Sequence, residues 1–370
     1  MTYGENNKLK LSFQISIPGG ESGGGSSSQS DSTIVNSIES STIDSGINLM
    51  NSYLSKEINL AHCKVIVFSE QFAYNGLYES LYTLINKTEI RPTANVIISR
   101  CSTEYFLKNS QPILEKLSAR YYDIVPTSSQ YTGYTEDLTL SQMFSDLNDT
   151  FKQCYAILGG VNTANSHNKD NKETSYENDA NNKAQETLIT SQPNIENMGL
   201  AVFSGDSLVG ELNGIETICH QLISNSLSTC IITIPSPFEK DDIISVRIKQ
   251  ASKTRNKVKL VNDSPYITSH VYLDVRILTM NQNSEYLNHE NVTKLETYIN
   301  SYLEEHLNDY FYKISKEYNS DIDGFGRYVV KDFSTWADWS KYNWLDNFKN
   351  SFFKPTVHST VKSGYIFLET

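Results

Sequence analysis

The sequence predicts an α+β protein made of three domains that each mix helices and strands. Its 370 residues exceed the length that one hydrophobic core usually organises. In the first part of the chain, short runs rich in β-branched residues alternate with amphipathic helical patterns, which is typical of a sheet covered by helices. Toward the carboxyl end, strands with one apolar face flank a long amphipathic helix. The third domain is therefore expected to be a sheet packed on that helix.

The first domain is expected to span residues 1–160. Alternating apolar residues indicate a strand over residues 9–17, and because little chain precedes it, we expect its neighbouring strand to come from a native segment ahead of this sequence. Residues 19–32, rich in glycine and serine, predict a flexible loop. The other predicted elements are helices over 43–54, 72–84 and 140–151, and strands over 65–68, 95–98 and 155–158.

Residues 161–197 interrupt this pattern. They are rich in asparagine, carry charges of both signs and hold few apolar residues. Such a segment buries too little surface to offset an ordering cost of about 1 to 2 kcal/mol per residue. It therefore predicts a disordered insert that separates the first domain from the second.

A small α+β middle domain is expected over residues 198–262. Two strand patterns, 199–203 and 207–211, are joined by a short turn, and Gly210 and Glu211 end the second pattern. Asn213 and Glu216 have the spacing of a capping box, so a helix should begin near Gly214. Further strands are predicted over residues 230–234, 243–248 and 257–261.

The third domain, residues 263–370, is organised by one long helix. Apolar residues recur there at steps of three and four, which predicts an amphipathic helix over residues 288–318. A strand with one apolar face is expected before it, over 271–277, and a closing strand after it, over 356–367. The helix should act as a scaffold against which this sheet packs.

A tight turn is predicted directly after the helix. Its residues of interest are Asp321, Asp323, Gly324, Phe325 and Gly326. Glycine allows backbone angles closed to other residues, and the two carboxylates can cap free amides. Trp336 and Trp339 follow at a spacing that places both on one helical face, and we expect them to pack in the core. Both Gly324→Val and Trp336→Ala should then act through stability, with about 3 to 5 kcal/mol lost on core truncation.

The composition argues against several classes of function. A formal net charge of −12 disfavours a duplex nucleic-acid partner, and only residues 249–259 gather lysine and arginine. The five cysteines form no CxxC pair and have no zinc-ligand spacing, so we interpret them as reduced and buried. No apolar run approaches the ~18 to 20 residues that span a bilayer.

Few residues suggest catalysis or metal binding. His62 beside Cys63 lacks a third ligand at a recognisable spacing, so a structural role is favoured. Asp321 and Asp323 match half of a calcium loop but lack the later bidentate glutamate, and capping is commoner than an acid–base role. Neither a nucleophile elbow nor an HExxH motif nor a P-loop occurs. The sequence predicts a binding or assembly protein without cofactor or metal, and no enzyme.

Taken together, the motifs resemble the C subunit of bacterial spore germinant receptors, the Ger(x)C family. In the first domain the resemblance rests on residues 62–70 and on residues 89–92, which include Arg91. In the second it covers most of residues 199–217, including Gly210, Glu211, Gly214 and Glu216. In the third it rests on residues 320–326, Trp336, Trp339 and the closing strand.

The resemblance implies a three-domain lipoprotein without enzymatic activity on the outer face of the spore inner membrane. Such a subunit would work with two integral membrane subunits, A and B, one transporter-like and nutrient-binding and the other implicated in ion passage. The complex would commit a dormant spore to germinate. Because this sequence shows neither a leader nor a lipid-accepting cysteine, we expect the lipid anchor to belong to a longer native form.

We therefore expect a non-enzymatic receptor subunit whose surfaces contact its partners and help the receptor signal. Two other hypotheses stay open. Many tyrosines, together with the tryptophans, would suit an extracytoplasmic protein that binds the germinant itself in an apolar pocket. Scattered carboxylates would suit a cell-wall hydrolase only if two of them converge across a cleft at roughly 5 to 9.5 Å.

Overall fold

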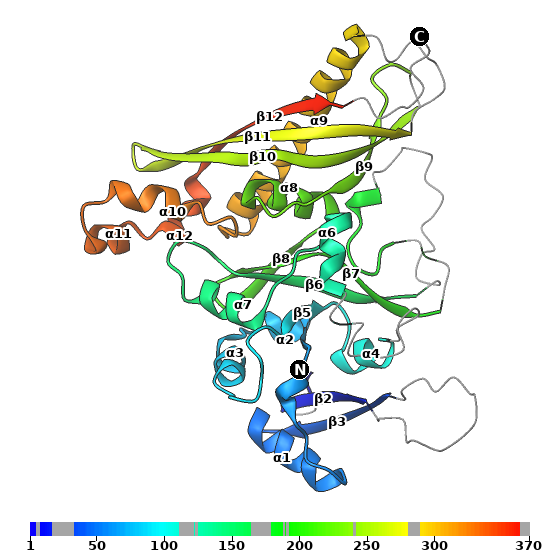
Figure 1. The fold of residues 1–370 in the computed structure, drawn as a ribbon. Coiled ribbons are helices and arrows are strands. Elements are labelled where there is room, and N and C mark those ends of the chain that lie inside the picture. The colour runs from blue at the N-terminus through cyan, green and yellow to red at the C-terminus, as the bar shows by residue number, and fades with distance from the viewer. Residues whose placement is uncertain are drawn as a thin grey trace.

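Three β-sheets follow one another along the molecule in the structure, a computed structural model (Figure 1). The structure describes residues 1–4, 8–16, 33–110, 122, 125–163, 179–187, 189, 192–239, 242–279 and 289–362. A three-stranded amino-terminal sheet, a five-stranded central sheet and a four-stranded sheet that carries the long helix make up an α+β fold. The fold class predicted from the sequence is confirmed.

The amino-terminal sheet is antiparallel, in the order β1-β2-β3. Its strands are β1 (Thr2–Tyr3), β2 (Leu9–Ser16) and β3 (Thr33–Ser40), and helix α1 (Ile43–Tyr53) packs against them. The prediction that the neighbouring strand of β2 comes from a segment ahead of this sequence is wrong, because β3 pairs with β2 along its whole length. Strict alternation is missing from β3, so periodicity did not reveal it. The loop predicted over residues 19–32 lies outside the described residues.

The central sheet has the order β4-β5-β6-β7-β8. Strands β4 (Val65–Ser69), β5 (Asn95–Ser99) and β6 (Tyr155–Asn162) run parallel, whereas β7 (Asn194–Ser204) and β8 (Ser207–Leu212) continue the sheet antiparallel. Every residue of β6 is buried, as expected for a middle strand covered on both faces. The helices of this part are α2 (Glu70–Ala73), α3 (Tyr78–Ile85), α4 (Thr103–Lys108), α6 (Ser129–Thr132) and α7 (Leu140–Leu147).

The four-stranded sheet has the order β12-β11-β10-β9. Strands β9 (Cys230–Pro235), β10 (Ile243–Val261) and β11 (Ser264–Thr279) are antiparallel neighbours, and β12 (Phe352–Val361) joins β11 in parallel. The strands predicted over 243–248 and 257–261 are one strand, β10. Residues between them keep pairing with β11 through register shifts, so the polar stretch there bends the strand without ending it.

One face of this sheet is covered by α8 (Gly214–Ser224) and α9 (His289–Tyr312). The predicted long helix is confirmed, and it continues as a π-helical turn over Lys313–Glu317. Between this turn and β12 the chain forms three short helices, α10 (Gly326–Val329), α11 (Trp336–Tyr342) and α12 (Trp344–Asn347).

Parts of the predicted disordered insert are ordered. Residues 164–178, 188, 190 and 191 lie outside the described residues. However, β6 extends to Asn162 and β7 begins at Asn194. Between them, Ala180 is fully buried, and the Lys183 ammonium lies 3.1 Å from the Glu211 carboxylate. Specific polar contacts thus order residues whose composition offers little apolar surface.

The sheets also cross the expected domain boundaries. Strand β7 starts before residue 198 and, with β8, completes the central sheet. Strands β10 and β11 form one hairpin across residue 262. The stretch expected to form a middle domain is therefore shared between the two larger sheets.

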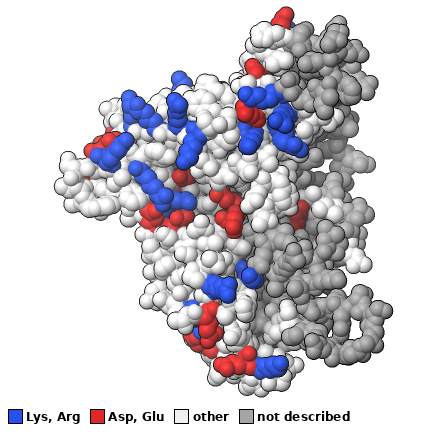
Figure 2. All heavy atoms as spheres, in the orientation of Figure 1, with Lys and Arg blue, Asp and Glu red and all other residues white. Residues whose placement is uncertain are grey.

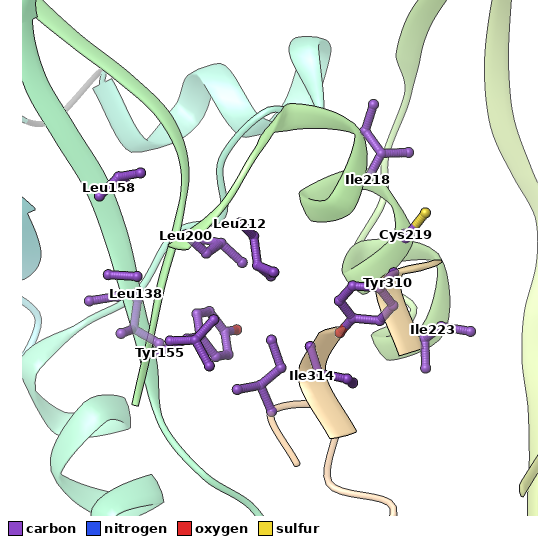
Figure 3. Packing of buried hydrophobic residues seen from close by; sticks show 14 of the residues in the cluster. Leu138, Tyr155, Leu158, Leu200, Leu212, Ile218, Cys219, Ile223, Tyr310 and Ile314 are labelled. Atoms are coloured by element: carbon purple, nitrogen blue, oxygen red, sulfur yellow. The ribbon is translucent and has the colours of Figure 1, made fainter. Parts of the chain in front are cut away.

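One hydrophobic core joins the central sheet to the four-stranded sheet. Figure 3 shows Tyr155, Leu200 and Leu212 of the central sheet facing Tyr310 of α9 and Ile314 of the π-helical turn, while Ile218 and Ile223 of α8 belong to the same core. A smaller core on the other face of the central sheet contains Ile97, Phe106 and Ile157, and lies under α4. The end of α9 therefore meets the central sheet deep inside the molecule.

Candidate functional site

A cluster of buried polar groups lies where the end of α9 meets α8 and the central sheet. We call it the buried junction, and its members are Glu136, His220, Tyr310, Asp321 and Asp323. His220 comes from α8, Tyr310 from α9, Glu136 from the loop before α7, and both aspartates from the turn after the π-helical segment. Only Glu136 keeps appreciable side-chain exposure, at 15%. Four segments that are distant in sequence thus share one polar interior.

Asp321 fixes the turn after the long helix. Its Oδ1 accepts hydrogen bonds from the amides of Gly324 (2.9 Å) and Phe325 (3.1 Å). Its Oδ2 accepts from the Gly326 amide (3.0 Å) and from the Trp344 indole N–H (2.8 Å). Burial, together with the charge of Asp323, raises the pKa of Asp321 to about 7, although the hydrogen bonds that it accepts oppose this rise. The expected capping role of Asp321 is thus what the structure contains.

The two glycines of this turn are required for different reasons. Gly324 has φ +72°, a backbone conformation that residues other than glycine adopt only at a cost in free energy. A Cβ on Gly326 would lie 2.8 Å from the Phe151 carbonyl oxygen and equally close to the Trp344 ring. Gly324 therefore serves the backbone bend, and Gly326 serves the close approach of two segments.

Asp323 does not cap amides, contrary to expectation, but binds two buried side chains. Its Oδ1 lies 2.8 Å from Nδ1 of His220, and its Oδ2 accepts a hydrogen bond of 2.9 Å from the Tyr310 hydroxyl. On the other side of the ring, Nε2 of His220 lies 3.2 Å from the Glu136 carboxylate. These two groups form an ion pair, but their geometry does not meet that of a hydrogen bond.

His220 is held as an imidazolium between these carboxylates. Burial alone lowers the pKa of His220, but the hydrogen bond to Asp323 and the charges of Asp323 and Glu136 outweigh it and raise the pKa to about 9. For Glu136, burial raises the pKa, yet the nearby positive charge of His220 brings it below its usual value. The rings of Tyr155 and His220 meet in an edge contact, with their centroids 4.8 Å apart. Tyr155 thereby closes the site toward β6.

Further contacts tie the end of α9 to the central sheet. The Ser320 hydroxyl donates to the Phe203 carbonyl at 2.6 Å, and the Tyr318 hydroxyl donates to the Glu211 carbonyl at 3.1 Å. The Lys313 ammonium lies 2.8 Å from the Glu216 carboxylate. The buried junction is therefore part of a wider attachment of the long helix to β7, β8 and α8.

The motif residues of the second predicted domain lie in this attachment. Glu216 completes the predicted capping box with Asn213 and also pairs with Lys313. Glu211 pairs with Arg100 at 3.2 Å and with Lys183. A Cβ on Gly210 would meet the Tyr318 ring at 2.2 Å, and one on Gly214 would meet the Ala180 carbonyl at 2.8 Å. These residues support packing at the attachment.

The tryptophans differ from expectation. Trp339 and Trp344 are buried and stack with ring centroids 6.2 Å apart, and the Trp339 indole donates to the Thr150 hydroxyl at 3.2 Å. Trp336 is 65% exposed and contacts Phe151 only at the edge of the core. The expectation that Trp336 packs in the core is wrong, because the face of α11 that it occupies turns toward solvent.

Chemically, the buried junction holds charges in place. The carboxylates are engaged with protein donors and enclosed, which is not the open cleft that hydrolysis would need. Among the residues that the structure describes, no group of three or more His, Cys, Asp or Glu side chains is arranged to hold a metal ion. Within the same residues, no helix is both long and apolar enough to cross a membrane.

Comparison with known proteins defines the family. Residues 1–159 match the family described as Spore germination protein N-terminal domain, and residues 198–364 match Spore germination B3/ GerAC like, C-terminal. The chain belongs to the Ger(x)C family of germinant receptor C subunits. The solved structure titled Crystal Structure of the GerBC protein has the same fold, with a TM-score of 0.56 and 16% identity over 97% of this chain and 94% of that one. No curated protein matches the chain.

This family consists of receptor subunits and is not a known class of enzymes. The remaining motif residues of the first Ger(x)C domain lie away from the buried junction. His62 ends a short 3₁₀ helix, Leu60–His62, and is exposed at the edge of a cavity near β2. Arg91 is exposed in the turn before β5. The structure therefore does not bring these two residues together with Asp321 and Asp323.

Sequence reasoning missed three members of the buried junction: Glu136, His220 and Tyr310. His220 has no ligand or catalytic partner at a recognisable spacing in the sequence, yet almost every residue of α8 is buried. A histidine in a helix that is buried on nearly every side must find polar partners, because an unpaired buried polar group is costly. In the sequence, however, the apolar residues of α8 recur at the spacing of one face, so no local pattern reveals that His220 is buried too.

Proposed function

We propose that this chain is a non-enzymatic lipoprotein subunit of a nutrient germinant receptor, needed for the assembly and signalling that trigger spore germination. Its partners would be the integral membrane subunits A and B, and its place the outer face of the spore inner membrane. Membership of the Ger(x)C family supports a role in a receptor complex.

The single observation that carries the non-enzymatic role is the enclosure of the buried junction. The ionisable groups with the strongest mutual contacts, His220, Asp323 and Glu136, face one another inside the protein. Such a set stabilises one arrangement of the two larger sheets and presents no reactive atom to a substrate. The chain would then act through the surfaces that this rigid body displays.

Purification from spore membranes tests the proposal. Detergent-solubilised membranes, bound through a tag on the native form of this chain, should yield both integral subunits. A strain that lacks the chain should lose its response to the nutrient while germinating normally with a non-nutrient trigger. Recovery of the chain without either subunit, together with an intact nutrient response in the deletion strain, would contradict the proposal.

A cavity favours a second candidate, an extracytoplasmic protein that binds the germinant directly. It measures about 840 Å³ and lies between the amino-terminal sheet with α1 and the edge of the central sheet. Its walls are mostly apolar, for example Leu11, Ile47 and Ile66, while Gln14 and Lys64 supply polar groups. This is the size and chemistry of a pocket for a small molecule.

Calorimetry separates the two candidates. Titration of the chain with amino acids, sugars and nucleosides should give no saturable heat if it acts only through surfaces. Saturable binding that is lost in Ile47→Trp, a variant that fills the cavity, would favour the second candidate.

A further inference from the structure

The face of the four-stranded sheet that points away from α8 and α9 is strongly basic, and we call it the basic face. On β10 its residues alternate with the buried Val246, Ile248 and Val258. The exposed cations of this strand include Arg247, Lys249, Arg255, Lys257 and Lys259. In Figure 2, lysine and arginine side chains gather over this sheet in the upper part of the view.

Neighbouring strands add to the same charge. Arg276 on β11 lies beside Arg247, and Lys354 on β12 continues the row formed by Lys257 and Thr268. Among the residues of the described strands that point to this face, Asp274 is the one acid. The chain as a whole carries a formal net charge of −12, so this concentration of positive charge runs against its composition.

Lys257, Lys259 and Lys354 have no carboxylate of the sheet beside them. Across the strands, Lys257 and Lys354 flank Thr268, and Lys259 faces Tyr266. Cations that are not paired within a fold keep their charge available to an external anion.

Exposed apolar side chains border the basic face near the β10–β11 turn. Phe352 is 60% exposed, Val261 56% and Tyr266 38%. Phe352 and Tyr266 are direct neighbours on adjacent strands, and the Lys316 ammonium lies 5.6 Å from the centre of the Phe352 ring. Aromatic and aliphatic groups beside lysines are typical of surfaces that contact a membrane interface.

We propose that the basic face docks on the surface of an anionic lipid bilayer. From Arg247 to Lys259 the cations extend over about 40 Å, and they occupy three adjacent strands. An array of this kind, wide in two directions, fits the many phosphates of a bilayer better than the single row of an acidic peptide. His358 stacks with both His270 and Tyr272, so its ring faces are not free for nucleobases. The inference rests on the membrane location given under the proposed function, but it requires no other receptor subunit, so vesicle binding can fail while the receptor role holds.

Vesicle co-sedimentation with the full chain tests this inference. We expect binding to phosphatidylglycerol-containing vesicles at 0.1 M salt, no binding to pure phosphatidylcholine vesicles, and release of the bound protein at 1 M salt, where the Debye length falls to about 3 Å. Lys257→Glu, Lys259→Glu and Lys354→Glu combined should lower the partition coefficient at least about 100-fold, since each basic residue near such a surface contributes roughly a fivefold factor.

Lys8→Glu, Lys56→Glu and Lys108→Glu combined form the matched control, because they change the net charge equally at exposed positions in the amino-terminal part of the molecule. This control should bind within about threefold of the parent chain. If both triple variants lose vesicle binding equally, the binding depends on net charge alone, and the proposal is overturned. So would failure to bind anionic vesicles at low salt, or binding to polyglutamate in preference to vesicles.

Discussion

In the buried junction, Asp323 and Glu136 flank His220 within 3.2 Å, whereas on the basic face Lys257 and Lys259 extend into solvent beside uncharged residues. The first set of charges is closed on itself and positions the end of α9 against α8. The second set remains open toward the outside. The difference teaches that charge density alone does not mark a functional surface, because enclosed charges serve the fold and only unpaired exposed charges are available to a partner.

The largest expected effect separates a buried tryptophan that contacts the buried junction from an exposed one outside it. Trp344→Ala should lower the free energy of unfolding by about 3 to 5 kcal/mol, because it leaves a cavity and removes an indole hydrogen bond to Asp321. Trp336→Ala, at an exposed position, should cost under about 1 kcal/mol. Urea unfolding of both variants measures this contrast, and equal losses would contradict the assigned burial.

The pH dependence of stability should report the enclosed imidazolium. His220 is protonated up to a pKa of about 9 in the folded chain and about 6.5 in the unfolded chain, so its contribution is complete below pH 6.5 and is lost as pH rises to 9. The loss should amount to about 3 kcal/mol. Unfolding curves of the parent chain and of His220→Gln isolate this contribution as their difference. A difference that stays constant from pH 6 to 9 would show that His220 is neutral.

Smaller effects should distinguish the two turn glycines. Gly326→Ala should cost about 1 to 3 kcal/mol, because its Cβ meets the Phe151 carbonyl and the Trp344 ring. Gly324→Ala should cost about 1 kcal/mol, because φ is positive there but the added Cβ has room, 3.6 Å from Lys152. Thermal melting of the two variants orders these costs. The reverse order would indicate that Lys152 or a neighbour restricts the site.

The smallest effect on folding is expected on the basic face. Reversing the charges of Lys257, Lys259 and Lys354 should change the free energy of unfolding by no more than about 0.5 kcal/mol, because all three are exposed and lack partners in the sheet. Urea unfolding of the triple variant checks this. A large loss would mean that the sheet itself needs these charges.

Elements with a strong local period were predictable from the sequence. The long helix, the β7–β8 hairpin and the capping box of Asn213 and Glu216 follow from side-chain spacing within a few residues. Strand β3 was missed because it lacks strict alternation, and the continuity of β10 was missed because register shifts carry it through a polar stretch.

One role in the candidate site was predictable for the same reason. Asp321 caps amides three to five residues away, so its role follows from the local motif. Asp323 instead pairs with His220, 103 residues away, and no local pattern specifies such a partner. The exposure of Trp336 likewise depends on how α11 docks, which helical spacing does not determine.

The most direct test of the account is a double-mutant cycle on His220 and Asp323, measured by urea unfolding at pH 7. If the buried junction is a matched set of charges, His220→Gln and Asp323→Asn should each cost about 3 to 5 kcal/mol, because each removes one partner of a buried charge pair. The double variant should then be at least about 2 kcal/mol more stable than the sum of the single losses implies. Single losses under about 1 kcal/mol that simply add would contradict the claim that these charges hold the long helix to the central body of the protein.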